Sequence, residues 1–186
     1  EGNGETLMIL HGLRTVVDPC ALQDAARIEA YVGCQCAVPT FNGRISRGPT
    51  IPSIRNVPYF SEQQIQFFKE VKTLVLINAQ TPAGFFGYPQ EERPGWTLPK
   101  DCKIVELALM ENDGVDLLKR LADALGCPTW SVPSSITIPT RSSKIMSSTS
   151  SNSLLNPEMP ITPEKCNNIM QRLSPDGFVL SNEGNT

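Results

Sequence analysis

The sequence is poor in the residues that most often carry metal, acid–base or nucleic-acid chemistry. It contains one histidine, His11, among 186 residues, and 16 basic against 19 acidic residues leave a net charge of −3. Without a basic excess there is no electrostatic footprint for nucleic acid or for an anionic membrane surface. No apolar run approaches the roughly 20 residues that cross a bilayer. No targeting presequence is visible either, so we expect a cytoplasmic protein.

The six cysteines do not form the pattern of a zinc site. Cys34 and Cys36 are the one close pair, on a predicted strand where both side chains point to the same face. No second Cys or His pair completes a set of four ligands. We therefore expect reduced, mostly buried cysteines in a reducing compartment.

A glycine-rich phosphate-binding turn is also missing. In a dinucleotide-binding unit it would follow the first strand, where this sequence has His11 and Gly12 alone. We interpret His11 as a hydrogen-bonded structural residue rather than a catalyst. The irregular stretch 39–58 holds arginines that are able to meet phosphates, although a solvated loop or salt bridges are more common. These are Arg44, Arg47 and Arg55.

Short apolar runs alternate with amphipathic stretches over residues 5–128. The run at 73–77 is apolar without interruption over four residues, which is typical of a strand covered on both faces in a parallel sheet. The alternation predicts an α/β fold, a three-layer, Rossmann-like domain with a parallel sheet. Strands are expected at 6–10, 34–38, 73–77 and 103–109, and helices at 18–33, from 61 and from 112.

Three helix starts carry capping signals. Asp18 followed by Pro19 is typical of an N-cap and a first helical position. Ser61 and Gln64 have the spacing of a capping box. Asn112 is predicted to cap the last helix, with acidic residues in the first turn where the helix dipole favours them.

The segment after the central strand points to the edge of the sheet where ligands usually bind in open α/β folds. It contains Phe85, Phe86 and Tyr88, an unusual concentration of aromatic residues for a loop. Three aromatic side chains so close together call for burial. We therefore favour packing against the end of the sheet or a neighbouring domain over contact with a ligand.

The composition changes after residue 130. Residues 131–153 hold ten serines and three threonines and no acidic residue. Such a stretch buries too little apolar surface to order itself. We predict a first domain at 1–130, a serine-rich linker at 131–156, and the start of a second, truncated α/β domain at 157–186.

Taken in order, these segments resemble the thiamine-diphosphate-dependent enzymes, in the branch with acetolactate synthase-like and benzoylformate decarboxylase-like proteins. LVLINAQTPAGFFGYP, LPKDCKIVELA and LLKRLADALG are similar to the middle domain of that branch, and FNGRISRGP and NVPYFSEQ fit the same pattern. Residues 161–186 resemble the start of its pyrophosphate-binding domain.

The resemblance implies a fragment of an enzyme that acts on 2-oxo acids, as a carboligase (a transferase) or a decarboxylase (a lyase). It implies thiamine diphosphate and Mg²⁺ in the full-length protein, a homodimer or homotetramer, and a structural role for the middle domain. The FFGYP loop is more similar to relatives without flavin, so FAD is not expected. The cofactor's diphosphate would lie beside a turn made of Glu183, Gly184, Asn185 and Thr186.

The residues that would complete that chemistry have no counterpart here. No segment of this sequence resembles the part of the family that holds the cofactor-activating glutamate, or its Mg²⁺-binding GDG…N segment. We therefore name no catalytic residue and no metal ligand, and we expect this chain alone to be inactive. Two alternatives stay open, a free-standing FAD- or NAD-binding module and an inactive interaction domain.

Overall fold

The computed structural model describes residues 5–48, 50–86 and 95–132, and beyond them Thr162, Cys166, Met170 and Ser174. The chain divides into two units, Glu1–Ile138 and Pro139–Thr186. In the second unit Cys166 and Met170 are helical. The predicted linker lies almost entirely outside the described residues, and the predicted turn at 183–186 lies outside them as well.

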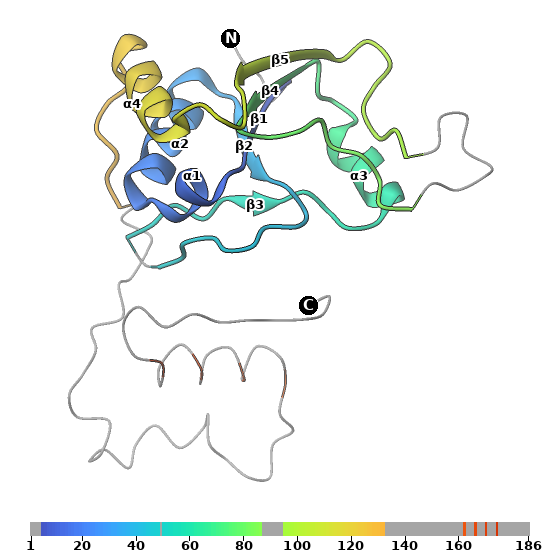
Figure 1. The fold of residues 1–186 in the computed structure, drawn as a ribbon, viewed down its shortest axis with the longest axis horizontal. Coiled ribbons are helices and arrows are strands. Elements are labelled where there is room, and N and C mark those ends of the chain that lie inside the picture. The colour runs from blue at the N-terminus through green and yellow to red at the C-terminus, as the bar shows by residue number, and fades with distance from the viewer. Residues whose placement is uncertain are drawn as a thin grey trace. The chain divides into compact units, whose positions relative to one another are not determined.

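The first unit is built on a parallel sheet, which confirms the predicted α/β class. Its strand order is β3-β2-β1-β4-β5, and every neighbouring pair runs parallel. Figure 1 shows β1 and β4 in the interior of the sheet. The chain lays down β2 and β3 on one side of β1, and β4 and β5 on the other. The strands are β1 (Thr6–Leu10), β2 (Gln35–Val38), β3 (Arg55–Asn56), β4 (Thr73–Ile77) and β5 (Lys103–Ala108).

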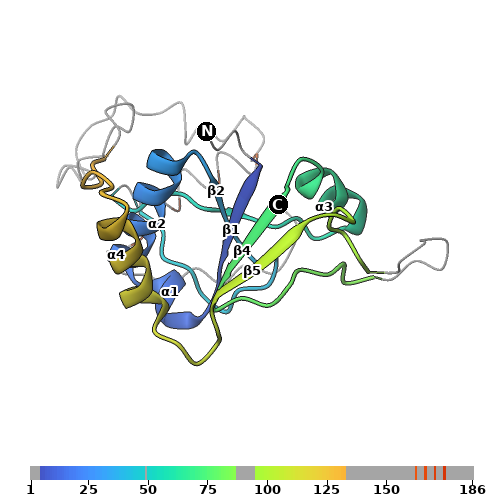
Figure 2. The same cartoon turned by 90° about the horizontal axis from the view of Figure 1, so that it is seen from above.

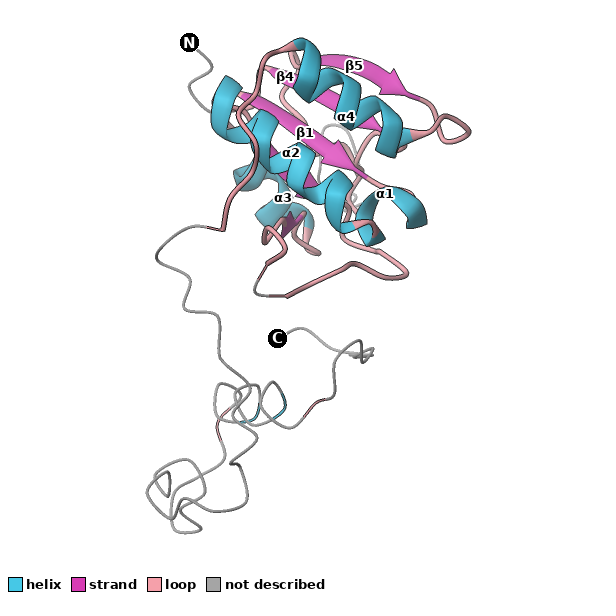
Figure 3. Cartoon of the chain, turned by 90° about the vertical axis from the view of Figure 1, so that its left-hand side faces the viewer, coloured by secondary structure: helices cyan, strands magenta, loops and turns pink. Residues whose placement is uncertain are grey.

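Helices cover both faces of this sheet. Figure 2 shows α1, α2 and α4 on one face and α3 on the other, and Figure 3 shows α2 and α4 side by side across the strands. The alternation of side chains along β1 serves both layers. Met8 and Leu10 belong to the core under α2 and α4, whereas Leu7 and Ile9 belong to the core with Phe68 of α3. The helices are α1 (Leu13–Val17), α2 (Pro19–Val32), α3 (Ser61–Phe68) and α4 (Gly114–Ala124). Among the described residues, no helix is long and apolar enough to cross a membrane.

The predicted start and end of α2 are confirmed. Asp18 Oδ1 accepts hydrogen bonds from the backbone N–H groups of Cys20 at 2.8 Å and Ala21 at 3.2 Å. Pro19 occupies the first helical position, where a missing N–H costs nothing. Gly33 ends the helix with φ of +76°, a conformation that other residues adopt only with strain.

The caps predicted for α3 and α4 are wrong. Ser61 is the first residue of α3 rather than its cap, and its buried hydroxyl donates to the carbonyl oxygen of Phe86 at 3.0 Å. Asp113, not Asn112, caps α4, accepting from the N–H groups at the start of the helix. Asn112 instead forms a hydrogen bond in the turn that precedes α4, where its Oδ1 accepts from the backbone N–H of Leu109 at 2.7 Å. In both cases the side chain that the local sequence pattern assigned to the cap forms its hydrogen bond elsewhere, in a tertiary contact for Ser61 and in a turn for Asn112.

Two elements were not expected. The first is α1, which follows Gly12, a residue with φ of +85°. The second is β3, two exposed residues that pair with the end of β2 inside the stretch predicted to be irregular. Arg55 of β3 lies 4.6 Å above the ring of Phe67, which gives this arginine a cation–π role inside the domain.

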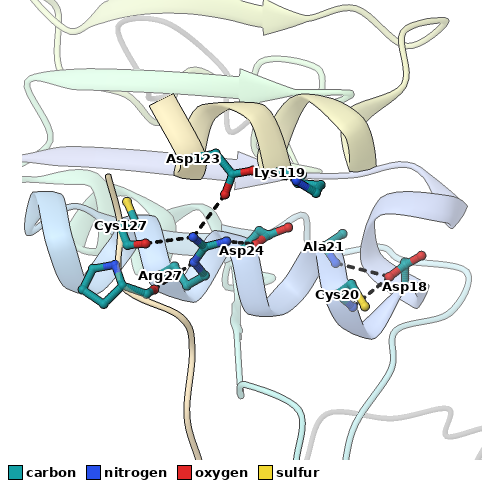
Figure 4. Close-up of polar contacts among 9 residues, drawn as sticks. Asp18, Cys20, Ala21, Asp24, Arg27, Lys119, Asp123 and Cys127 are labelled. Atoms are coloured by element: carbon teal, nitrogen blue, oxygen red, sulfur yellow. Dashed lines mark hydrogen bonds and ion pairs between the residues drawn. The ribbon is translucent and has the colours of Figure 1, made fainter. Parts of the chain in front are cut away.

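Arg27 ties α2 to α4 and to the chain that follows it (Figure 4). Its guanidinium pairs with Asp24 at 2.6 Å and Asp123 at 3.3 Å, with 15% of the arginine side chain exposed. The same group donates to the carbonyl oxygens of Cys127 at 2.8 Å and Pro128 at 2.9 Å. The hydrogen bond that Arg27 donates to Asp24 raises the pKa of Arg27, and desolvation opposes this effect. The side chain of Arg27 therefore fixes Cys127 and Pro128, where the chain leaves the helix layer of α2 and α4.

Candidate ligand-binding cleft at the switch point

A cleft of about 610 Å³ lies where β1, β2, β4 and β5 end. Chain segments diverge here because the strand order reverses between β1 and β4, and such switch points are the usual ligand sites of open α/β sheets. The volume is within the range of small-molecule sites. The lining comes from His11 after β1, residues 39–41 after β2, residues 80–85 after β4, and Met110 after β5.

No charged side chain is found among the described residues that line this cleft. The described lining is apolar and aromatic, and its polar side chains are uncharged amides, hydroxyls and one imidazole. In the described part of the chain, no group of three His, Cys, Asp or Glu residues is placed to hold a metal ion. The described lining therefore offers neither a phosphate-binding cation nor a cation-binding carboxylate.

Five aromatic side chains form what we call the aromatic cluster, and three of them, Phe41, Tyr59 and Phe85, line the cleft. Tyr59 is central: its ring centroid lies 5.9 Å from that of Phe85 in a stacked arrangement, and 5.8 Å from that of Phe86 edge to face. Phe41 completes a triangle with Tyr59 and Phe85 at 5.7 and 5.6 Å. The members of the aromatic cluster are Phe41, Tyr59, Phe60, Phe85 and Phe86.

Packing of the aromatic loop against the end of the sheet is not observed among the described residues, whereas its packing against a neighbouring domain stays a prediction. Phe85 is 63% exposed and Phe86 40% exposed within the described residues, and Tyr88 lies outside them. The rings shield one another's edges instead of lying beneath the sheet, and edge-to-face pairs stabilise that arrangement only by about 0.5–1.5 kcal/mol each. An aromatic surface of this kind, left open beside a cleft, is typical of a binding site.

Gln64 of α3 is a buried polar residue of the cleft, although the sequence pattern predicts a capping role for it. It is 2% exposed, and its Nε2 donates to the carbonyl oxygen of Pro58 at 2.8 Å. Because a carbonyl only accepts, this contact fixes which end of the amide is nitrogen. The other end, Oε1, has no hydrogen-bond partner among the described residues. The one sequence signal for this role is the spacing of four residues from buried Phe68, which places Gln64 on the inward face of the helix.

His11 is held by hydrogen bonds, which supports its interpretation as a structural residue. Its backbone N–H donates to the carbonyl oxygen of Ile77 at 3.0 Å. Its Nδ1 lies 3.3 Å from Oδ1 of Asn42. The ring also lines the cleft, so its position is set by β1 and by the loop after β2.

Asn78, the first residue after β4, directs the chain toward the cleft. It has φ of +50°, in the left-handed region that asparagine tolerates better than most residues. Its Oδ1 accepts from Thr15 at 2.9 Å, and its Nδ2 donates to the carbonyl oxygens of Leu109 at 2.5 Å and Asn112 at 3.0 Å. A Cβ atom on Gly114 would lie 1.9 Å from that Oδ1, so only glycine fits beside it. This fully bonded amide joins the ends of β4 and β5 to α1 and α4.

The cysteines are free, as expected, but they are not mostly buried. Cys34, Cys36 and Cys127 are buried, whereas Cys20 and Cys166 are exposed. A hydrogen bond between Cys34 and Cys36 lowers the pKa of the first thiol and raises that of the second, which burial raises further.

The site residues predicted from the resemblance, Glu183, Gly184, Asn185 and Thr186, lie outside the described residues. Their role as a diphosphate site stays a prediction. The edge of the sheet indicated by the end of β4 is the edge that carries the cleft.

Comparison with known proteins gives one relevant relative. The chain is 35% identical over 121 residues to a Mycobacterium tuberculosis protein named "Putative acetolactate synthase large subunit IlvX". The match covers 65% of this chain and 23% of the relative, so the chain corresponds to about a quarter of that protein. No protein-family model and no solved structure matches the chain. The similarity agrees with the acetolactate synthase-like resemblance of the sequence.

Proposed function

We propose that this chain is part of a thiamine-diphosphate-dependent enzyme that acts on 2-oxo acids. Residues 1–130 would form the middle domain and residues 157–186 the start of the pyrophosphate-binding domain. The observation that carries the proposal is the 35% identity over 121 residues to a protein named as an acetolactate synthase large subunit. The parallel α/β sheet supports it, because a middle domain of this class requires that fold.

When bound, thiamine diphosphate supplies an electron sink for the carbanion that remains after a 2-oxo acid loses carbon dioxide. The described residues do not fit this group. The described lining of the cleft has no cation for a diphosphate, and the described part of the chain has no cluster of carboxylates for Mg²⁺. We therefore assign the described domain a structural role and place cofactor binding elsewhere, including the turn at Glu183–Thr186. The uncharged lining also supports the proposal that FAD, with its pyrophosphate, is not bound in the cleft.

The activity would be that of a carboligase or a decarboxylase, in a cytoplasmic homodimer or homotetramer. An assay of the protein encoded by the complete reading frame tests this directly. With Mg²⁺ and thiamine diphosphate we expect consumption of pyruvate or benzoylformate, and we expect no turnover when the cofactor is omitted. Absence of 2-oxo acid turnover with every substrate tried, together with absence of cofactor binding, would refute the proposal.

The 186-residue chain alone serves as the comparison. We expect no turnover from it and at most weak binding of thiamine diphosphate with Mg²⁺ in calorimetric titration. Micromolar binding by this chain would show that the diphosphate site has been misplaced.

A further inference from the structure

The cleft at the switch point has no part in the function proposed above, yet it has three properties of a binding site. It is concave, it lies at the carboxyl ends of parallel strands, and aromatic rings stand exposed at its mouth. Soluble proteins seldom leave such rings exposed beside a cavity of this size without use.

The rings select an aromatic guest. Phe41, Tyr59 and Phe85 all line the cleft, and their centroids lie 5.6–5.9 Å from one another. Phe85 is 63% exposed, so a planar guest has an open face on which to stack.

Gln64 selects a donor. Its Oε1 is buried, its amide orientation is fixed by the bond from Nε2 to Pro58, and no described residue donates to that oxygen. A buried acceptor without a partner is destabilising, and an N–H or O–H group on the guest removes that penalty.

The described residues of the lining carry no charged side chain, which favours an uncharged guest. A carboxylate or phosphate that enters the cleft loses water and meets no cation among these residues. An ammonium group likewise meets no carboxylate among them.

We propose that the cleft binds an uncharged aromatic molecule that carries an N–H or O–H donor, with its ring against Tyr59 and Phe85 and its donor on Gln64 Oε1. This proposal does not depend on the thiamine-diphosphate assignment. It concerns a site that the described domain holds by itself.

Two probes of equal size test the donor requirement on the 186-residue chain. Indole and benzofuran have the same bicyclic shape, but an oxygen replaces the N–H group in benzofuran. In ligand-observed saturation-transfer titrations we expect indole to bind about tenfold more tightly, as one hydrogen bond to an otherwise unpaired buried acceptor requires. Indole-3-acetate, which adds a negative charge, is expected to bind more weakly than indole.

Variants then locate the site. Gln64→Leu removes the acceptor and should make the affinities for indole and benzofuran equal. Phe85→Ala should weaken both probes by a similar factor. Tyr31→Ala is the matched control, because Tyr31 is an exposed aromatic residue of α2 that does not line the cleft, and it should leave both affinities unchanged.

Three results would overturn the proposal. One is equal affinity of indole and benzofuran for the wild-type chain. Another is that neither probe binds at concentrations up to about 10 mM, which is roughly the weakest specific affinity expected for so small a ligand. The last is tighter binding of indole-3-acetate than of indole. None of these needs a variant, so the test holds even if Gln64→Leu does not fold.

Discussion

Two buried amides at the same edge of the sheet have opposite hydrogen-bonding states. Asn78 bonds through both ends of its side chain, to Thr15, Leu109 and Asn112. Gln64 uses its nitrogen alone and leaves its oxygen without a described partner. The difference indicates that Asn78 holds the fold together, while the oxygen of Gln64 stays available for something that enters the cleft. Substitutions at the two positions should therefore have very different effects on stability.

The largest effect is expected for Asn78→Ala. The substitution leaves the Thr15 hydroxyl and the carbonyl groups of Leu109 and Asn112 without their partner, and it places alanine in the left-handed region. At about 1 kcal/mol for each of these losses, the free energy of unfolding should fall by about 3–4 kcal/mol. Urea denaturation followed by circular dichroism measures it. A fall below 1 kcal/mol would mean that the corner around Asn78 is not a structural node.

Gly114→Ala tests the close packing of α4 against the side chain of Asn78. The new Cβ would lie 1.9 Å from Asn78 Oδ1 and 2.6 Å from Thr15 Oγ1, so these side chains must move. Overpacking of this kind costs about 1–3 kcal/mol. Gly43→Ala is the matched control, because nothing lies within 4 Å of its added Cβ, and it should leave the urea midpoint unchanged or slightly raised. Equal midpoints for the two variants would contradict the close packing described for Gly114.

Thr15→Val leaves the side-chain oxygen of Asn78 without a donor, which is the state described for the side-chain oxygen of Gln64. The shape of the side chain is kept, but Asn78 Oδ1 loses its donor at 2.9 Å. The unfolding free energy should drop by about 1–2 kcal/mol, as for a buried acceptor left unpaired. Thr15→Ser restores the hydroxyl and should recover part of that loss. If the serine variant is no more stable than the valine variant, the hydrogen bond is not the cause.

The smallest effect is expected for Gln64→Leu. It removes one hydrogen bond, but the carbonyl of Pro58 keeps a contact with the Thr40 hydroxyl at 3.0 Å. It also removes an acceptor that has no described partner. The two changes have opposite effects on stability. The free energy of unfolding, measured by thermal denaturation, should therefore change by no more than about 1 kcal/mol. A loss as large as that of Asn78→Ala would indicate that Gln64 is bonded within the folded chain after all.

Much of this fold follows from local sequence. The apolar run of β4, the strand at residues 6–10 and the Asp18–Pro19 start of α2 each depend on nearby residues, and each was predicted from them. The elements that were missed depend on distant contacts. Two residues of β3 form a strand only because β2 lies beside them, and α1 is too short to show a helical period.

The candidate site divides in the same way. Its position at the end of β4 follows from the general geometry of parallel sheets. The role of Gln64 does not, because Ser61 and Gln64 match a capping box equally well in sequence. What decides between the two roles is the carbonyl of Phe86, which is 25 residues away and accepts the Ser61 hydroxyl. Exposure of Phe85 is likewise set by the rings that surround it rather than by its own sequence neighbours.

Arg27 has a mechanical consequence. Because its guanidinium binds the carbonyl oxygens of Cys127 and Pro128, a pulling force applied to the chain after Pro128 reaches α2 before it reaches the last turn of α4. The load is then carried by two hydrogen bonds to the departing chain, while the ion pair with Asp123 joins Arg27 to α4. Tension from whatever follows this domain would act on the packed pair of helices as one body, and would not peel α4 away from its end.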